Sequence, residues 1–215
     1  MNIAIVGIHT GIGKTLASAI ICEAIQADYW KPVQAGSLDH SDSDEVKGLI
    51  TNTKTVIHPE AFRLSQPLSP HAAAKIDNKK IEIENIAIPV IKNHLVIETA
   101  GGLMSPINDE QTNLDLIRHF NLPVILISQN YLGSINHSLL TLTVLKSNGV
   151  NIKGILFNGD ENLATQQYIL NHSKLTDWGR IDSLKEVTKG AVAKEARLLA
   201  LLLIKLFHEV ISRER

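Results

Sequence analysis

Residues 7–15, Gly-Ile-His-Thr-Gly-Ile-Gly-Lys-Thr, combine a glycine-rich turn with a cation and a hydroxyl. The segment follows the apolar run 3–6 and precedes a helix-forming stretch. A turn in this context directs backbone N–H groups and the positive end of a helix toward one point, which suits a polyanion. There, Lys14 would reach outer phosphates and the Thr15 hydroxyl would ligate Mg²⁺. The sequence therefore predicts a nucleoside triphosphate site, although five residues rather than the usual four separate Gly7 from Gly13.

The second expected strand, residues 29–31, ends in a lysine, and an acidic loop follows further along the chain. Lys31 ends that strand, and the strand ends of an α/β sheet face its ligands, so this side chain is either a ligand contact or an ordinary surface lysine. The polar loop 40–45 then enters a helix. One of its carboxylates would cap the helix and one would supply an oxygen to Mg²⁺. Both interpretations stay open because two Asp residues are available.

Glu98 ends a third apolar strand, residues 94–98, and two glycines follow shortly after it. An acid at this position is typical of the second metal-side carboxylate in phosphate-loop enzymes. A carboxylate at the end of a buried strand needs a partner, and Mg²⁺ would be one. The glycines would let the backbone approach a ligand closely.

Two later segments also follow buried strands. Asn158 fits a turn residue, and its amide would equally pair with the donor and acceptor of a purine edge. Residues 132–137, Leu-Gly-Ser-Ile-Asn-His, open a helix. Free N–H groups at a helix start suit an anion, and the alternative is a plain helix cap by Ser134.

Apolar, β-rich runs alternate with helical patterns along the chain. Strands are expected at residues 2–6, 29–31, 94–98, 123–128 and 154–158, with a weaker one at 178–181. Helices are expected at residues 14–27, 42–50, 83–92, 113–120, 135–148, 163–171 and 191–211. The alternation predicts an α/β fold with a mostly parallel sheet of the phosphate-loop type, helices on both faces, and a single domain over residues 1–215.

The composition favours a globular protein, with 44% hydrophobic and 20% charged residues. A net charge of -1 gives no broad attraction for nucleic acid or an anionic membrane. The longest apolar run, residues 198–204, is far below the ~18 residues that a membrane span needs. Cys22 is the only cysteine, and we expect it to be a buried, inert thiol. With a first strand that starts at residue 2, no signal peptide is expected, and the protein should be cytoplasmic.

Together these segments resemble the dethiobiotin synthetase family. The phosphate loop shares the family's longer gap and matches it at Gly7, Thr10, Gly13, Lys14 and Thr15. The other matches, in chain order, are Lys31-Pro32-Val33 with Gly36, Ser43-Asp44, Ser69-Pro70-His71, Glu98 with Ala100-Gly101-Gly102, Leu132-Gly133 with Ile135-Asn136-His137, and Asn158. The match fades beyond Asn158, where the family's Gly-x-Ile-Pro turn lacks its proline here.

The chain also departs from the family within the matching segments. Ile8, His9 and Gly11 differ from the usual phosphate loop, and Thr99 replaces a glycine. Ala35 stands where members usually carry a Ser or Thr hydroxyl near the substrate. This change bears on substrate affinity more than on the class of reaction.

The resemblance implies an ATP-dependent ligase of biotin biosynthesis, which forms C–N bonds in 7,8-diaminopelargonate with CO₂ and yields dethiobiotin, ADP and phosphate. Lys14 and Lys31 would be catalytic, with Mg²⁺ held near Thr15, Asp44 and Glu98. The implied ATP contacts are Thr10, Gly11, Ile12, Gly13, Lys14, Thr15, Leu16, Asp44, Glu98, Thr99, Ala100, Gly101 and Asn158. The implied substrate contacts are Ala35, Gly133, Ser134, Ile135 and Asn136. In the family the segment around Gly133 reaches the neighbouring subunit's substrate, which implies a homodimer.

The alternative on the same fold is an ATPase switch of the partitioning or assembly type, whose hydrolysis toggles a dimer. Such proteins typically carry a second lysine early in the phosphate loop, where this chain has Ile8 and His9. A nucleotide-binding module without chemistry would not need the charged residues at the strand ends. Fold analogy alone does not separate these functions.

Overall fold

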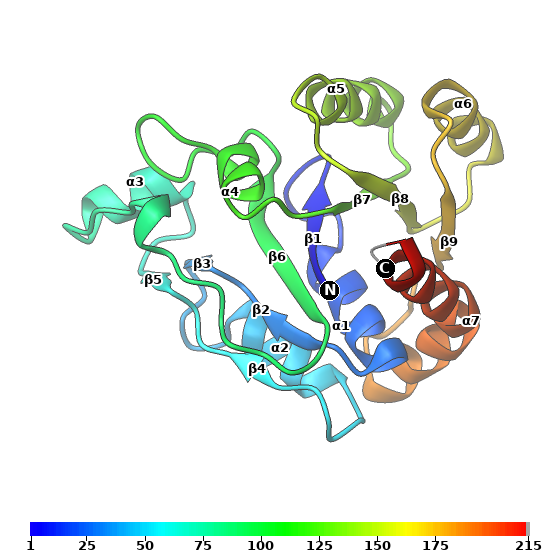
Figure 1. The fold of residues 1–215 in the computed structure, drawn as a ribbon, viewed down its shortest axis with the longest axis horizontal. Coiled ribbons are helices and arrows are strands. Elements are labelled where there is room, and N and C mark those ends of the chain that lie inside the picture. The colour runs from blue at the N-terminus through cyan, green and yellow to red at the C-terminus, as the bar shows by residue number, and fades with distance from the viewer. Residues whose placement is uncertain (214–215) are drawn as a thin grey trace.

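The computed structural model describes residues 1–213, with side chains through residue 204. The predicted single domain also spans residues 214 and 215, which lie outside the described residues. Within this range a 7-stranded sheet has the order β4-β2-β6-β1-β7-β8-β9, and every paired neighbour in it is parallel. The predicted α/β fold with a mostly parallel sheet is confirmed (Figure 1).

The strands of the main sheet are β1 (Asn2–Gly7), β2 (Asp28–Trp30), β4 (Ile57–His58), β6 (Leu95–Gly102), β7 (Val124–Gln129), β8 (Ile152–Asn158) and β9 (Asp177–Ile181). The central strands are mostly apolar because helices cover both of their faces. Ile3, Ile5 and Ile125 are fully buried, for example. In the register of the sheet, Ile5 lies opposite Glu98 on one side and Ile125 on the other.

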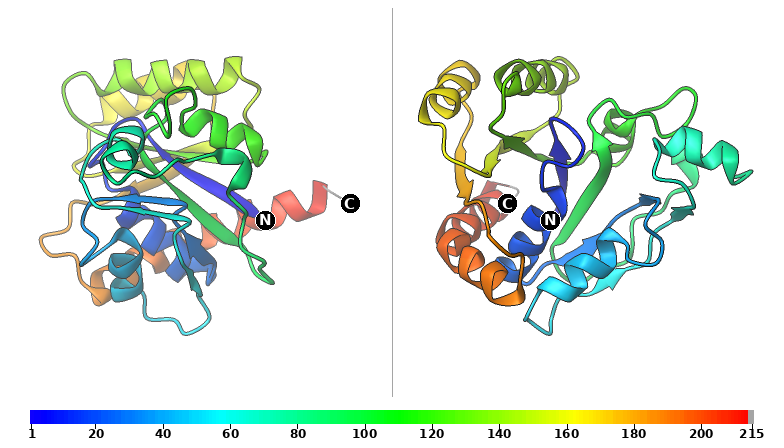
Figure 2. Two further views of the ribbon diagram at one scale, coloured as in Figure 1. Left: turned by 90° about the vertical axis from the view of Figure 1, so that its left-hand side faces the viewer. Right: turned by 180° about the vertical axis from the view of Figure 1, so that it is seen from behind.

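Helices form a layer on each face of the sheet (Figures 1 and 2). One layer contains α1 (Lys14–Ile25), α2 (Asp42–Leu49) and α7 (Lys189–Arg213). The other contains α4 (Asn113–His119), α5 (Ser134–Ser147) and α6 (Leu163–Ser173). Helix α1 begins just after β1, at the edge of the sheet formed by the carboxyl ends of its parallel strands.

A smaller parallel sheet pairs β3 (Val33–Ala35) with β5 (Phe62–Leu64). It lies beside α3 (Pro70–Ile76), at one side of the molecule (Figure 1). The sequence analysis did not predict β3, β4, β5 or α3. The strands are only two or three residues long, too short to show a period of alternating polarity.

The predicted helix at residues 83–92 is wrong. Only the 3₁₀ turn η1 (Ile83–Asn85) forms, and residues 86–94 are not helical. Pro89 explains the difference, because its ring disfavours helical backbone at the preceding residue and it has no N–H to donate. The burial of Ile83 and Ile86 shows that the apolar spacing reflects a packed extended segment.

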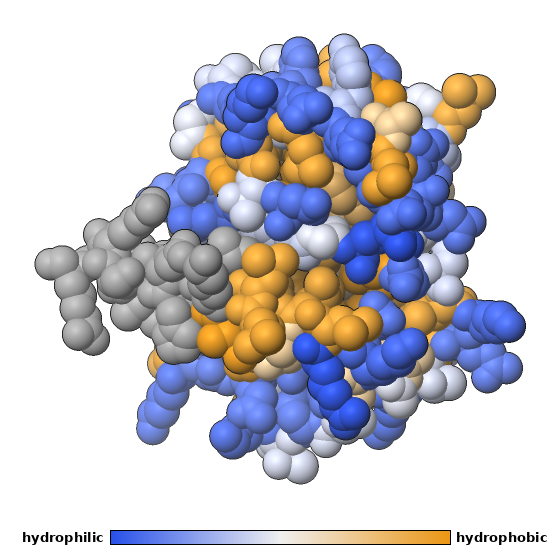
Figure 3. Space-filling view, turned by 90° about the vertical axis from the view of Figure 1, so that its right-hand side faces the viewer, coloured by the Kyte–Doolittle hydropathy of each residue, from blue (hydrophilic) through white to orange (hydrophobic). Residues whose placement is uncertain are grey.

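Apolar side chains gather on part of the face shown in Figure 3. Within α7, Leu198 and Leu201 are exposed. Val192 and Leu203 of the same helix are fully buried. Among the described residues, no helix combines the length and the hydropathy that a membrane crossing requires.

Candidate active site

The phosphate loop joins β1 to α1 as the sequence predicted. Gly13 is the residue before the helix and has a left-handed backbone with φ of 85°. A side chain there would also collide with the Asn158 amide, which explains the glycine. Lys14 opens the helix with a buried side chain, and its Nζ donates to the His9 carbonyl at 3.3 Å.

Burial lowers the pKa of Lys14 from 10.5 to about 8, because the charged form loses its hydration. The nearby Glu98 carboxylate opposes this shift, whereas the Lys31 ammonium adds to it. Among the described residues no ion pair holds Lys14, which lies at the start of a helix, where anions are favoured.

Glu98 is the centre of the polar cluster and only 1% exposed. Its Oε1 accepts from Thr15 Oγ1 at 3.0 Å and from Lys31 Nζ at 3.2 Å. Its Oε2 accepts from Ser18 Oγ at 3.1 Å and from Tyr29 OH at 3.0 Å. Burial alone would raise the pKa of Glu98, but the lysine ammonium groups hold the pKa below its ordinary value. Glu98 is thus an ionised carboxylate in the interior.

Lys31 lies directly after β2, beside β6, and is 5% exposed. Its Nζ contacts the carboxylate of Asp42 as well as that of Glu98. The alternative of a surface lysine is therefore wrong. Two carboxylates and one buried ammonium here meet at the edge where the phosphate loop begins.

The structure separates the two acids of the loop before α2. Asp44 is exposed, and its Oδ2 accepts from the backbone N–H and the hydroxyl of Ser41, closing a capping box. These hydrogen bonds lower the pKa of Asp44. Asp42 is the residue that reaches Lys31. The predicted role of Asp44 as an ATP and metal contact is not supported by this position, and Asp42 lies where that carboxylate was expected.

A cavity of about 570 Å³ opens beside this cluster. Its walls include Thr10, Lys31, Ala35, Asp42, Ala100 and Gly101, all from the segments singled out in the sequence. Ser37 and Ser69 add hydroxyl groups to the same walls. Ala35 therefore lines a cavity next to Lys31, as its expected substrate contact requires, although it brings no hydroxyl.

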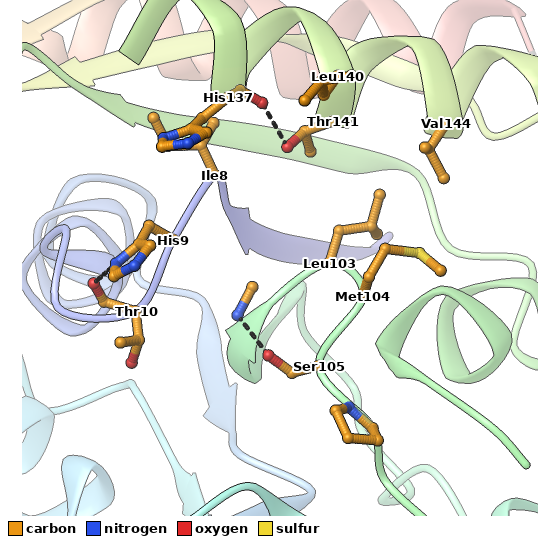
Figure 4. Close-up of a pocket in the computed structure, with 12 residues that line it drawn as sticks. Ile8, His9, Thr10, Leu103, Met104, Ser105, His137, Leu140, Thr141 and Val144 are labelled. Atoms are coloured by element: carbon orange, nitrogen blue, oxygen red, sulfur yellow. Dashed lines mark hydrogen bonds between the residues drawn. The ribbon is translucent and has the colours of Figure 1, made fainter. Parts of the chain in front are cut away.

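A second cavity of about 510 Å³ shares Thr10 and Ser105 with the first. Figure 4 shows Leu103 and Met104 on one side of it and Leu140 and Val144 of α5 on the other. Its lining is mainly apolar, whereas charged side chains lie in the first cavity. The two cavities together offer a charged end and an apolar end.

The remaining predicted nucleotide contacts are spread around the phosphate loop. Gly11 is exposed, Leu16 is half-buried and Ile12 is buried. Asn158 is buried, and its Nδ2 donates to the Ile12 carbonyl at 2.9 Å. Thr99 donates to the carbonyl of Ile5 in β1, so its hydroxyl is bonded within the sheet.

Residues 132–136, at the start of α5, line neither of the two cavities, whereas His137 in the first turn of the helix lines the second cavity. Gly133, with φ of 101°, is the residue that precedes the helix, and no side chain caps it. The alternative of a cap by Ser134 is therefore wrong. Ser134 is buried, whereas Asn136 is exposed and Ile135 is half-buried. Leu132 just before them is fully exposed.

The donor set fits Mg²⁺, which prefers one or two carboxylates together with phosphate oxygens and water. Thr15 supplies a hydroxyl oxygen, and Asp42 and Glu98 supply carboxyl oxygens, around Lys31. Among the described residues there is no group of three or more His, Cys, Asp or Glu side chains that could hold a metal alone. A cation here would therefore need oxygens from a bound nucleotide.

Sequence reasoning missed two polar residues of this cluster, Ser18 and Tyr29, and assigned to Asp44 the position that Asp42 occupies. The two missed residues had a usable signal in their spacing. Ser18 is three residues after Thr15 on α1 and therefore lies on the same helix face. Tyr29 is two residues before Lys31, which places both side chains on the same side of an extended segment.

A parallel sheet whose first strand leads through a glycine-rich turn to Lys14 and Thr15 defines a phosphate-loop nucleotide-binding protein. Residues 1–191 match the family model described as an AAA domain. The fold is similar to a ParA family ATPase from Chlorobium tepidum, with a TM-score of 0.58 and 14% identity over 91% of this chain and 97% of that one. It is also similar to the septum site-determining protein MinD from Pyrococcus horikoshii, with a TM-score of 0.55 and 14% identity over 98% and 96%.

Sequence relatives are much closer, and they carry the name ATP-dependent dethiobiotin synthetase BioD. The protein from Christiangramia forsetii is 51% identical over 83% of this chain and 86% of its own. Those from Cytophaga hutchinsonii and Chlamydia pneumoniae are 45% and 44% identical, over 89% of this chain in each case and over 93% and 86% of their own. The chain belongs to the ATP-dependent dethiobiotin synthetase family, whose members are ligases that form C–N bonds.

Proposed function

We propose that this chain converts 7,8-diaminopelargonate, CO₂ and ATP to dethiobiotin, ADP and phosphate. Membership of the family supports the reaction. The observation in the structure that carries it is the buried Lys31, which lines a cavity beside the phosphate loop and contacts Asp42 and Glu98. This arrangement puts a cation between the expected phosphates and an open substrate space.

The phosphate loop would bind the triphosphate through its backbone N–H groups and Lys14, whose charge the phosphates would stabilise. Thr15, Asp42 and Glu98 would hold Mg²⁺, which would neutralise negative charge on the phosphates when bound. Lys31 would then release the carboxylates and reach the oxygens of the γ-phosphoryl group. Asn158 borders the phosphate loop, which supports its predicted contact with the base.

The reaction requires positioning and charge stabilisation rather than a protein nucleophile. An unprotonated amine of the substrate adds to CO₂ and loses a proton, giving a carbamate. A carbamate oxygen takes the γ-phosphoryl group as the bond to ADP breaks. The second amine attacks the activated carbon, loses its proton and expels phosphate, which closes the ring. Lys14 and Lys31 stabilise the charge on the phosphoryl oxygens during transfer.

We further propose a homodimer in which each substrate site draws on both chains. The substrate carries a carboxylate at the far end of an apolar chain, and the two lysines of the site are committed to phosphate. The free N–H groups at the start of α5 suit that carboxylate, yet residues 132–136 line neither cavity within one chain, and only His137 of this segment reaches the second cavity. Leu132, Leu140 and Met104 are exposed on the surface nearby, which supports their burial against a second copy.

The substrates of the proposed reaction are small molecules, and the net charge of -1 gives no support for nucleic acid or membrane partners. ATP is a cytoplasmic co-substrate, which supports a cytoplasmic location.

Release of ADP by the purified protein tests this function. We expect release in the presence of Mg²⁺ to depend on both the diamine and bicarbonate, and omission of either should reduce it to background. Equal ATPase activity without the diamine, or stimulation by DNA instead, would favour the ATPase switch of the partitioning type. That alternative has the same fold, so only the substrate dependence separates the two.

A further inference from the structure

The second oxygen of Glu98 contacts two residues that the proposed reaction does not use. Ser18 Oγ and Tyr29 OH donate to Oε2, at 3.1 and 3.0 Å. Thr15 and Lys31 donate to Oε1. A carboxylate offers about four lone-pair positions, so these four donors occupy all of them. Thr15 and Lys31 form one pair of donors, next to the phosphate loop, and Ser18 and Tyr29 form a second, more deeply buried pair.

The backbone explains why the two deeper donors reach the same oxygen. Thr15 and Ser18 are one helical turn apart on α1. Tyr29 lies on β2, which pairs with β6 so that Trp30 is opposite Ile97, next to Glu98. Ser18 and Tyr29 are both fully buried. Rigid elements therefore present each hydroxyl to Glu98 from a different side.

The torsion that sets the plane of a glutamate carboxylate is broad and has no sharp rotamer preference. The direction of Oε1 is therefore set by hydrogen bonds rather than by the side chain itself. Lys31 and Thr15 are themselves expected to rearrange when nucleotide binds. Only Ser18 and Tyr29 are left to hold the carboxylate plane during that exchange.

We propose that Tyr29 and Ser18 are positioning residues for the nucleotide site, which hold Glu98 so that Oε1 faces Thr15 and Lys31. The inference rests on the proposed function in one respect, that Glu98 ligates the divalent cation. Neither hydroxyl touches substrate, so both act through Glu98. Partners that orient a metal-ligating side chain in this way typically change metal affinity or activity by about 10- to 100-fold when removed.

Tyr29→Phe tests this inference, because it removes the hydroxyl and keeps the ring in the core. Ser18→Ala removes the other donor. Binding of Mn²⁺ in the presence of ADP, followed by electron paramagnetic resonance, should weaken about tenfold in each variant. The kcat should fall while the KM for the diamine stays unchanged. Tyr168→Phe is the matched control, since this tyrosine is exposed on α6 and should leave both quantities unchanged.

Circular dichroism and Tm identify variants that fold, and if one variant fails to fold the other decides the outcome. Folded variants with a lower Tm but wild-type Mn²⁺ affinity and kcat would overturn the proposal, because the hydroxyls would then serve stability alone. Glu98→Gln must itself weaken Mn²⁺ binding, and unchanged affinity there would overturn the proposal as well. Absence of dethiobiotin formation together with the expected Mn²⁺ effects would overturn the proposed function and leave this inference standing.

Discussion

Lys14 and Lys31 lie near the same carboxylate but are held by different contacts. Lys14 donates to a backbone carbonyl at the start of α1, whereas Lys31 contacts the carboxylates of Asp42 and Glu98. In the proposed mechanism Lys14 would hold ATP throughout the reaction. Lys31 would have to leave these carboxylates before it could act on the phosphoryl group in that mechanism.

Lys31→Ala should therefore reduce kcat by on the order of 10²-fold or more while ATP still binds, because its charge is needed most during phosphoryl transfer. Lys14→Ala should weaken ATP binding as well. Calorimetry with ATP and turnover measurements separate these effects. Lys75→Ala is a suitable control, because that lysine is an exposed partner of Asp109. Near-normal kcat in Lys31→Ala would remove this residue from the catalytic set.

Ala35 lines the cavity beside Lys31 without a hydroxyl. Ala35→Ser should lower the KM for the diamine a few-fold without much effect on the KM for ATP, because one added hydrogen bond is worth about 0.5–1.5 kcal/mol. Steady-state kinetics with each substrate varied in turn measures this. If the KM for the diamine does not change, a neighbouring hydroxyl such as that of Ser37 already fills the role.

Single residues of the site were predictable where a motif fixed both the residue type and the strand end. Lys14, Thr15, Lys31 and Glu98 meet as expected for this reason. The choice between Asp42 and Asp44 was not predictable, because it depends on where α2 begins. Once Ser41 precedes the helix, the residue three positions later closes the capping box and Asp42 turns toward Lys31.

At the scale of elements, the start of α2 contains Asp44, which caps the helix, next to Asp42, the proposed magnesium ligand that contacts Lys31. Asp42→Ala should lower kcat about tenfold or more and raise the Mg²⁺ concentration needed for half-maximal activity, since it removes a proposed ligand. Asp44→Ala should lower Tm modestly through loss of the cap and leave the Mg²⁺ requirement unchanged. Magnesium titrations of the two variants, side by side, check this. The reverse pattern would restore Asp44 as the metal-side carboxylate.

The long elements of the fold were predictable because strong apolar runs and helical periods cover them. Helix α1 and strands β1, β7 and β8 lie within a few residues of their expected positions. The error at residues 83–92 arose because apolar spacing was given more weight than Pro89. Short strands such as β4 (Ile57–His58) depend on pairing with β2, which a local pattern does not contain.

At the scale of the whole molecule, the account predicts a dimer with shared sites. Asn136→Glu places a negative charge at the exposed start of α5 and should inactivate the partner's site by repelling the substrate carboxylate. Mixed with an inactive Lys31→Ala chain, it should restore up to about half of normal activity per heterodimer, because one site is then wholly wild type. Asn136→Gln is the neutral control and should keep its activity.

Heterodimer formation in that experiment is verified by differently tagged chains. The absence of rescue despite proven heterodimers, or a monomer in solution at assay concentration, would contradict the shared site. Neither outcome would affect the assignment of Lys14 and Lys31 within one chain.

The central claim is that the chain uses ATP to incorporate CO₂ into the ring of dethiobiotin. The most direct test supplies isotopically labelled bicarbonate with ATP, Mg²⁺ and 7,8-diaminopelargonate and analyses the product by mass spectrometry. The account predicts dethiobiotin that carries the label, formed in equal amount to the ADP released. ADP release without labelled dethiobiotin would contradict it.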